Sequence, residues 1–170
     1  MSKLISIITP AYRAKKYIEA TVKSVLSQTY PHWELLIISD DQEDYSSFLA
    51  QKGIRDNRIK HYTTGGIGKG SSVGRNIGLQ EAKSDYIALL DADDWFKPTK
   101  LEKVVPLLET YDLVSSAINL INKEQVLLQR AGNQVETGAY PFEAFKFINF
   151  SSNSNIVFNK KKLPYTFAQN

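Results

Sequence analysis

The chain has 170 residues, which at roughly 150 residues per domain argues for one domain with at most a small appendage. Hydrophobic residues make up 42% and charged residues 23%, which excludes a disordered or fibrous protein, and the absence of cysteine excludes disulfides and thiol chemistry. The 21 basic and 18 acidic residues give a net charge of +3, which is too small to indicate a nucleic-acid partner.

The N-terminal stretch, MSKLISIITPAYRAKK, combines a basic residue with a short apolar run, as signal peptides do. The run is only about six residues long and no small-residue cleavage site follows it, so we interpret it as a first strand. No apolar run reaches the roughly 18–20 residues of a membrane-spanning helix. We therefore expect a soluble cytoplasmic domain, with peripheral association at the inner face of a membrane left open.

Two periodicities alternate along the first hundred residues. Short apolar runs predict strands at residues 4–9, 33–39 and 86–90, and residues 59–63 predict a weaker strand. Apolar residues at helical spacing predict helices at residues 15–28, 44–52 and 71–82, and another after Pro98 that kinks or ends early at Pro106. Strands that alternate with helices indicate an α/β fold, Rossmann-like, with a mostly parallel sheet covered by helices on both faces.

The pattern changes after Tyr111. Residues 113–121 could form one more strand, but the rest of the chain has no sustained periodicity. We therefore expect an α/β core at residues 1–111 and a looser second part at residues 112–170.

Polar and acidic residues follow three of the predicted strands. Residues 9–13 (TPAYR) follow the first strand, Asp40 and Asp41 the second, and residues 91–94 (DADD) the strand at 86–90. Ligands of open parallel sheets bind beyond the carboxyl ends of the strands. These residues therefore predict a site for a polar ligand at that edge.

Asp91 and Asp93 are two residues apart, so in extended chain both side chains point to the same side. Two converging carboxylates repel unless a cation or protons lie between them, and hard oxygen ligands favour Mg2+ or Mn2+. The alternative is that Asp91 only caps a turn and that Asp93 and Asp94 begin a solvated loop.

The glycine-rich segment at residues 65–70 (GGIGKG) fits neither a Walker A loop nor a GxGxxG fingerprint, which argues against a dinucleotide-dependent oxidoreductase. It follows a predicted strand and opens a helix, so its backbone amides could face a phosphate; the alternative is a flexible surface loop. Arg75 lies one turn into that helix, where a guanidinium could reach a diphosphate or lie exposed to solvent.

Four segments, ITPAYR, SDDQED, GKGSSVGRNIGL and ALLDADDWFKP, together resemble the inverting glycosyltransferases of family 2, which have the GT-A fold. The motifs occur in the family's order between Ile5 and Pro98, and the remaining chain resembles the family only loosely. The resemblance implies a nucleotide-sugar-binding core at residues 1–111 and the start of an acceptor-side region at residues 112–170.

The resemblance also assigns donor-binding residues at the first two strand ends. Pro10, Ala11 and Tyr12 match the loop that packs around the base and ribose. Asp40 matches the aspartate that hydrogen-bonds the base, typically uracil, and a carboxylate suits an imide N–H. The usual DDGS turn appears as residues 39–42 (SDDQ), which leaves open whether Asp40 or Asp41 faces the base.

Further along the chain, Arg75 and Asn76 match the pair beside the diphosphate and sugar. Asp91, Ala92 and Asp93 match the DxD motif, with Asp91 near the ribose and donor sugar and Asp93 the expected ligand of Mg2+ or Mn2+. The metal ligands implied by the resemblance are therefore Asp93 and Asp91.

The implied reaction transfers a sugar, with inversion, from a nucleotide-sugar, most simply a UDP-sugar, to a hydroxyl of a sugar, glycan or lipid-linked acceptor. Members of the family use a carboxylate base downstream of the DxD motif. Beyond Asp112 the chain offers only Glu124, Glu136 and Glu143, none in a matching context, so the catalytic base is unassigned and the chain is interpreted as stopping short of it. The alternative is a catalytically silent nucleotide-sugar-binding module.

Overall fold

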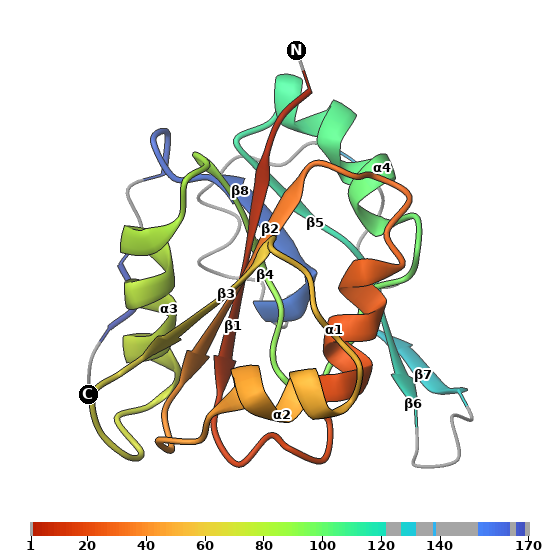
Figure 1. The fold of residues 1–170 in the computed structure, drawn as a ribbon. Helices are drawn as coiled ribbons and strands as arrows, with labels where there is room; N and C mark the ends of the chain where they lie inside the picture. Colours follow the sequence, from red (N-terminus) through yellow and green to blue (C-terminus); the bar gives the residue numbers. More distant parts are fainter. Residues whose placement is uncertain (1, 122–126, 132–137, 139–152, 164–165, 169–170) are drawn as a thin grey trace.

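The computed structural model describes residues 2–121, 127–131, 138, 153–163 and 166–168. Its centre is a six-stranded sheet in the order β3-β2-β1-β4-β8-β5 (Figure 1). Five strands run in the same direction, and β8 runs antiparallel to both of its neighbours. The strands of this sheet are β1 (Ile5–Ala11), β2 (Trp33–Ser39), β3 (Ile59–Thr63), β4 (Tyr86–Leu89), β5 (Leu113–Ser115) and β8 (Ile156–Asn159).

Helices cover both faces of this sheet, as Figure 1 shows. One face carries α1 (Ile18–Leu26), α2 (Tyr45–Gln51) and α4 (Lys100–Val104), whose apolar residues pack in one core cluster. The other face carries α3 (Ser71–Glu81) and forms a second, smaller cluster. The prediction of an α/β fold with helices on both faces is confirmed.

The alternation of side chains along the central strands explains why their sequences are almost continuously apolar. In β2, Leu35 and Ile37 face the cluster beneath α1 and α2, whereas Leu36 and Ile38 face the cluster beneath α3. All four are at most 1% exposed. A parallel strand buried on both faces has no solvated side on which polar residues could alternate.

Close packing of α3 on β1 depends on two glycines four residues apart. A Cβ atom at Gly78 would lie 2.4 Å from Cγ2 of Ile8, and one at Gly74 would lie 3.0 Å from Cβ of Pro10. The helix backbone therefore approaches the strand more closely than any side chain would allow. This contact places the first turns of α3 at the carboxyl end of β1.

All four strands predicted in the first hundred residues are present, and the helix after Pro98 ends as Pro106 predicts. That helix, α4, stops at Val104 and continues as a 3-10 helix over Val105–Glu109, because the proline lacks an N–H to donate.

The single strand predicted at residues 113–121 is wrong, because the chain divides into β5 and β6 (Ile118–Ile121). β6 leaves the main sheet and pairs with β7 (Leu127–Ala131) as a two-stranded sheet. The break lies at Ser116, whose N–H donates to the carbonyl of Asn155 and whose hydroxyl accepts a hydrogen bond from Lys100.

The short apolar stretch IVF forms β8, which inserts between β4 and β5. Residues on both sides of position 111 thus share one sheet, and the division into donor and acceptor parts there stays a prediction. In the part of the chain that the structure describes, no helix is both long and apolar enough to cross a bilayer.

Candidate functional site

The carboxyl ends of β1, β2 and β4 meet at one edge of the sheet, together with the first turn of α3 (Figure 1). The chain continues from β1 to β2 on one side and later returns to place β4 on the other side of β1. This reversal of strand order is where open α/β sheets bind ligands. Tyr12, Asp40, Arg75 and Asp91 all come from segments that meet at this edge.

Asp40 follows β2 and is only 3% exposed. Its Oδ1 accepts hydrogen bonds from the hydroxyl of Thr64 (2.7 Å) and the N–H of Lys69 (3.0 Å), and its Oδ2 accepts from the N–H of Gly70 (2.8 Å). Its backbone carbonyl accepts a further bond from the N–H of Gly68. The carboxylate thus holds the glycine-rich loop against the end of β2.

These bonds correct one expectation about the loop. The backbone N–H groups of residues 68–70 all donate hydrogen bonds to Asp40 and therefore do not point at a phosphate. Nor is the loop a loose surface segment. Gly65, Gly68 and Gly70 have φ of +71°, +68° and +97°, a backbone region that side chains rarely adopt, so glycine is needed to fold the loop around the carboxylate.

Asp41 points toward the β1 side of the edge. Its carboxylate accepts hydrogen bonds from the N–H of Arg13, the hydroxyl of Tyr45 and the hydroxyl of Ser39. Burial raises the pKa of Asp41, but hydrogen bonds, led by that from the Arg13 N–H, outweigh burial and hold the pKa below its usual value. The carboxylate fixes the turn after β1, where Arg13 has φ of +52°.

The segment predicted to surround the base is mostly buried. Ala11 is completely buried and accepts a hydrogen bond from the N–H of Asp40, and Pro10 packs against Gly74. Tyr12, in contrast, is 45% exposed, and its hydroxyl would lie 4.0 Å from a Cβ at Gly68. Tyr12 is therefore the side chain of this segment that can offer a ring face to a ligand.

Arg75 on α3 is 6% exposed and forms an ion pair with Asp91, with 2.6 Å between Nη2 and Oδ1. Its Nη1 donates to the hydroxyl of Ser71, whereas its Nε is buried and has no hydrogen-bond partner among the described residues. A buried N–H without a partner costs roughly 1–3 kcal/mol, so the site favours an additional acceptor there.

Asn76, next in sequence, does not join this ion pair. Its side-chain amide donates to the carbonyl of Phe167 (2.9 Å), and its Oδ1 accepts from the N–H of the same residue (2.8 Å). The structure therefore brings Arg75 and Asp91 together and directs Asn76 to the C-terminal segment.

The DxD turn is held from two sides. The N–H of Asp91 donates to the hydroxyl of Ser154, and the carbonyl of Ala92 accepts from the hydroxyl of Thr21. The Ala92 side chain lies in the core, and Asp93 is exposed. Burial, with smaller contributions from the neighbouring carboxylates, raises the pKa of Asp94, although a hydrogen bond with Ser154 opposes the rise.

Asp91 and Asp93 fit the predicted metal only as partial ligands. Arg75 engages one oxygen of Asp91, whereas the Asp93 carboxylate is exposed to solvent. Among the described residues, no group of three or more Asp, Glu, His or Cys side chains is arranged to hold a metal ion. Mg2+ is commonly bound by one or two carboxylates and completes its coordination shell with water and phosphate oxygens. The carboxylates of Asp91 and Asp93 fit this preference.

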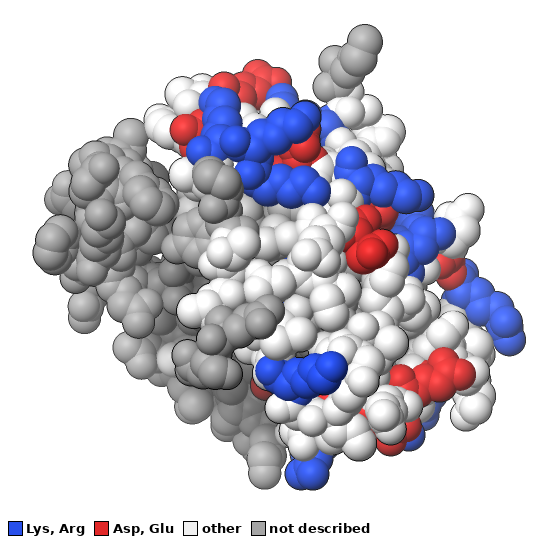
Figure 2. All heavy atoms as spheres, turned by 90° about the vertical axis from the view of Figure 1, so that its left-hand side faces the viewer, with Lys and Arg blue, Asp and Glu red and all other residues white. Residues whose placement is uncertain are grey.

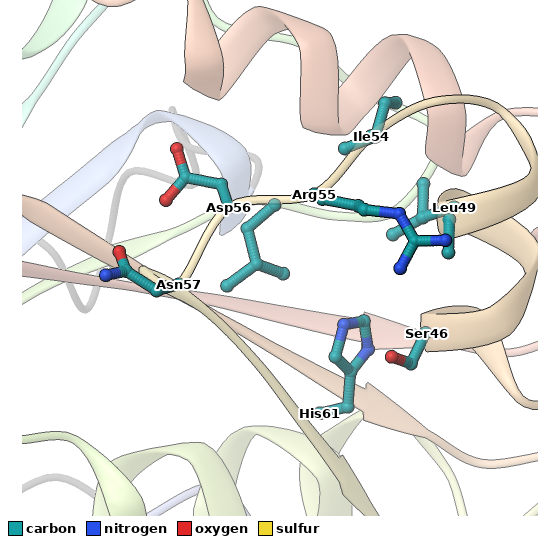
Figure 3. Close-up of a pocket in the computed structure, with 9 residues that line it drawn as sticks. Ser46, Leu49, Ile54, Arg55, Asp56, Asn57 and His61 are labelled. Carbon is teal, nitrogen blue, oxygen red and sulfur yellow. The ribbon is translucent and has the colours of Figure 1, made fainter.

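Two other surface features lie outside this edge. A pocket of about 390 Å³ between α2 and β3 is lined by Ser46, Leu49, Arg55 and His61, among others, and by none of the predicted site residues (Figure 3). Charged side chains gather at the opposite, amino-terminal end of the sheet on the face of α3 (Figure 2). There, Lys160 caps the end of α3 through the carbonyls of residues 79 and 82.

Three residues at the edge were not expected from the sequence: Thr64, Ser154 and Phe167. Each contacts a predicted residue across a long separation in the chain, so no local pattern marks it. The apolar run IVF directly after residues 153–155 indicates a strand, but not that the strand pairs beside β4 and so brings Ser154 to Asp91.

The chain is similar in sequence to curated glycosyltransferases. The chain is 42% identical over 100 residues to the glycosyltransferase TuaG of Bacillus subtilis, covering 59% of this chain and 40% of that protein. It is 41% identical over 105 residues to WfgD of Escherichia coli, a UDP-Glc:alpha-D-GlcNAc-diphosphoundecaprenol beta-1,3-glucosyltransferase, covering 62% of this chain and 41% of that protein. The chain thus spans about two fifths of the length of these curated relatives.

Solved structures confirm the fold. S. aureus TarS 1-349 in complex with UDP-GlcNAc covers 97% of this chain with a TM-score of 0.69 and 18% identity, and 48% of that chain is matched. The mannosyltransferase PcManGT of Pyrobaculum calidifontis, in complex with GDP-Man and Mn2+, covers 71% of this chain and 36% of its own, with a TM-score of 0.58 and 19% identity. The family described as Glycosyl transferase family 2 matches residues 6–164, and the chain belongs to this family.

Proposed function

We propose that this chain forms the donor-binding part of an inverting glycosyltransferase that uses a UDP-sugar and a divalent metal. The acceptor we propose is a hydroxyl of a lipid-linked sugar, which would place the reaction at a membrane surface. Support comes from WfgD, whose name specifies UDP-Glc and a diphosphoundecaprenol-linked sugar, and from the TarS complex with UDP-GlcNAc.

The observation that carries the proposal is the burial and hydrogen bonding of the Arg75 guanidinium. The guanidinium is almost fully buried and bonded to one carboxylate, and no described residue accepts a hydrogen bond from its Nε, so it suits an anion bound at the same edge. A diphosphate supplies several acceptor oxygens in the geometry that a guanidinium fork favours. The carboxyl edge of the sheet would then hold the diphosphate between α3 and the DxD turn.

The remaining side chains divide the other tasks. Tyr12 offers an exposed ring at the end of β1, where a base can stack. Asp91 and Asp93 would hold Mg2+ or Mn2+, and PcManGT, whose structure contains Mn2+, supports that choice. The metal, when bound, supplies positive charge that neutralises the diphosphate leaving group.

In the proposed reaction the acceptor oxygen attacks the anomeric carbon from the face opposite the diphosphate, and the bond from that carbon to the diphosphate oxygen breaks. Arg75 stabilises the negative charge that develops on the leaving diphosphate. The proton of the acceptor hydroxyl passes to a carboxylate base. No described residue is assigned as this base.

Calorimetry tests the donor site directly. We expect the chain to bind UDP more tightly with Mn2+ than without it, and more tightly than GDP. Asp93→Ala should remove the dependence on Mn2+, whereas Asp85→Ala, at the opposite edge and paired with Lys161, should not. A protein that binds no UDP, with or without Mn2+, would contradict the proposal.

Turnover is tested separately by measuring UDP release from UDP-glucose with a diphospho-lipid-linked sugar as acceptor. Since no described carboxylate is assigned as base, we expect binding with slow or no transfer by this chain; loss of a general base costs roughly 10²–10⁴ in rate. Rapid transfer would show that the chain supplies its own base. UDP binding without any transfer is expected both of the donor-binding part of an enzyme and of a catalytically silent binding module.

A further inference from the structure

The side chain of Asn76 binds the backbone of one distant residue at both of its polar groups. Its Nδ2 lies 2.9 Å from the carbonyl oxygen of Phe167, and its Oδ1 lies 2.8 Å from the N of Phe167. This is the pattern by which one strand residue binds another across a sheet. The carboxamide thus fixes the C-terminal segment at residues 166–168 beside α3 (Figure 1).

Phe167, held in this way, packs on the functional arginine. The Cζ atom of Arg75 lies 5.5 Å from the centroid of the Phe167 ring, within range of a cation–π interaction. The same guanidinium donates to Asp91 and to the hydroxyl of Ser71. The Phe167 ring, the Ser71 hydroxyl and the Asp91 carboxylate therefore restrict its position from different directions.

We propose that Asn76 is a positioning residue for the donor site: it holds Phe167 against Arg75, and so keeps the guanidinium at Asp91. In this role Asn76 does not touch the nucleotide-sugar. The inference rests on the proposed function, because it takes Arg75 to be the group that binds the diphosphate.

Asn76 is assigned this role because Phe167 already occupies the polar groups of its side chain. A carboxamide offers two donors and an acceptor, and in Asn76 both the nitrogen and the oxygen are already bonded to Phe167. A direct contact with the donor sugar would have to compete with these bonds. An arginine side chain, by contrast, has many rotamers, so a ring packed on the guanidinium reduces what ligand binding must order.

The test is a double-mutant cycle on the full chain, with UDP affinity in Mn2+ measured by calorimetry. Asn76→Ala and Phe167→Ala should each weaken UDP binding about tenfold, the range of a lost cation–π contact and its ordering. The double variant should be no weaker than either single variant, because both changes remove the same contact. Gln80→Ala, which removes an exposed carboxamide from the same helix, should bind UDP as the unmodified chain does.

Amide hydrogen exchange at position 167, followed by NMR, reports the hydrogen bonds between Asn76 and Phe167. Asn76→Ala should accelerate this exchange at least tenfold, whereas Gln80→Ala should not. Unchanged exchange in Asn76→Ala would overturn the proposal, and so would faster exchange with unchanged UDP affinity. Phe167→Ala leaves α3 intact, so unchanged UDP affinity in this variant would overturn the proposal even if Asn76→Ala failed to fold.

Additive losses, about a hundredfold in the double variant, would show that Asn76 and Phe167 act independently and would also overturn the proposal. If the unmodified chain binds no UDP, the proposed function fails and the inference fails with it. If the unmodified chain binds UDP and the two single variants bind equally well, only the inference fails.

Discussion

Arg75 and Asp91 form an ion pair in which Nη2 of the arginine lies 2.6 Å from Oδ1 of the aspartate, although sixteen residues separate them in the chain. Gly78 lets α3 pack directly on Ile8 of β1, and β4 pairs in parallel with β1, so that its carboxyl end lies at the same edge of the sheet. The end of β4 and the first turn of α3 therefore meet. The ion pair is a consequence of strand order and of a helix that approaches the sheet closely.

Arg75→Lys should weaken UDP binding at least tenfold while the protein stays folded. A lysine retains the charge but cannot donate to Ser71, Asp91 and a diphosphate at once, as the guanidinium fork can. Calorimetry with UDP and Mn2+ measures the effect. Arg55→Lys is the matched control, because Arg55 is an exposed arginine that lines the pocket between α2 and β3. Equal affinities in the two variants would contradict the role of Arg75.

Asp40→Asn should release the glycine-rich loop. In the variant one carboxylate oxygen becomes an NH2 group that faces an N–H or hydroxyl donor, so a buried donor loses its acceptor, at a cost of about 1–3 kcal/mol. We expect a lower free energy of unfolding in urea and faster amide exchange at Lys69 and Gly70. Asp41→Asn should leave these two amides protected, because Asp41 binds the turn after β1 instead. Protected loop amides in Asp40→Asn would show that other contacts hold the loop.

Local sequence was sufficient to predict the four strands of the first hundred residues and to select candidate residues that lie at one edge of the sheet. Residues 33–39 (WELLIIS) contain a continuous apolar run at residues 35–38, and the strand has the predicted bounds in the structure. The predicted Asp40, Arg75 and Asp91 lie at one edge because parallel strands bring their carboxyl ends together, a property of the topology that alternating strands and helices already imply.

Contacts across the chain could not be predicted in the same way. Residues 149–155 (NFSSNSN) have the composition of a loop, and nothing in them indicates that the hydroxyl of Ser154 accepts the N–H of Asp91. Likewise, the glycines at residues 65–70 indicate an unusual backbone but not that its amides face Asp40. Such pairings depend on which segments the sheet order brings together, and a single sequence does not contain that order.

Ser154→Ala should destabilise the DxD turn. The change leaves the buried N–H of Asp91 without an acceptor and removes a hydrogen bond to Asp94. We expect the free energy of unfolding to fall by about 1–2 kcal/mol and UDP binding in Mn2+ to weaken. The same substitution at exposed Ser46 on α2 is the control and should change neither quantity. A stable variant with full UDP affinity would show that the turn does not need the Ser154 hydroxyl for its geometry.

Lys100 provides a test that depends on pH. Its Nζ donates to the hydroxyl of Ser116 and, at 3.2 Å, to the carbonyl of Asn155. Within the described part of the chain no carboxylate forms an ion pair with it. Burial without an opposite charge lowers the pKa of Lys100 to about 8.

Because the pKa of this lysine is about 8 in the folded chain and 10.5 in the unfolded chain, the unfolded chain binds more protons between these two values. The contribution of Lys100 to stability should therefore rise as the pH increases from 8 to 10, and below pH 8 the cost of burying the charge is present in full. Lys100→Met removes this titration and serves as the reference, since other groups titrate in both proteins. We expect the free energy of unfolding of the unmodified chain to rise relative to Lys100→Met by up to about 2 kcal/mol over this range, measured by urea denaturation. A constant difference between the two proteins from pH 8 to 10 would show that the ammonium group is solvated in the folded state.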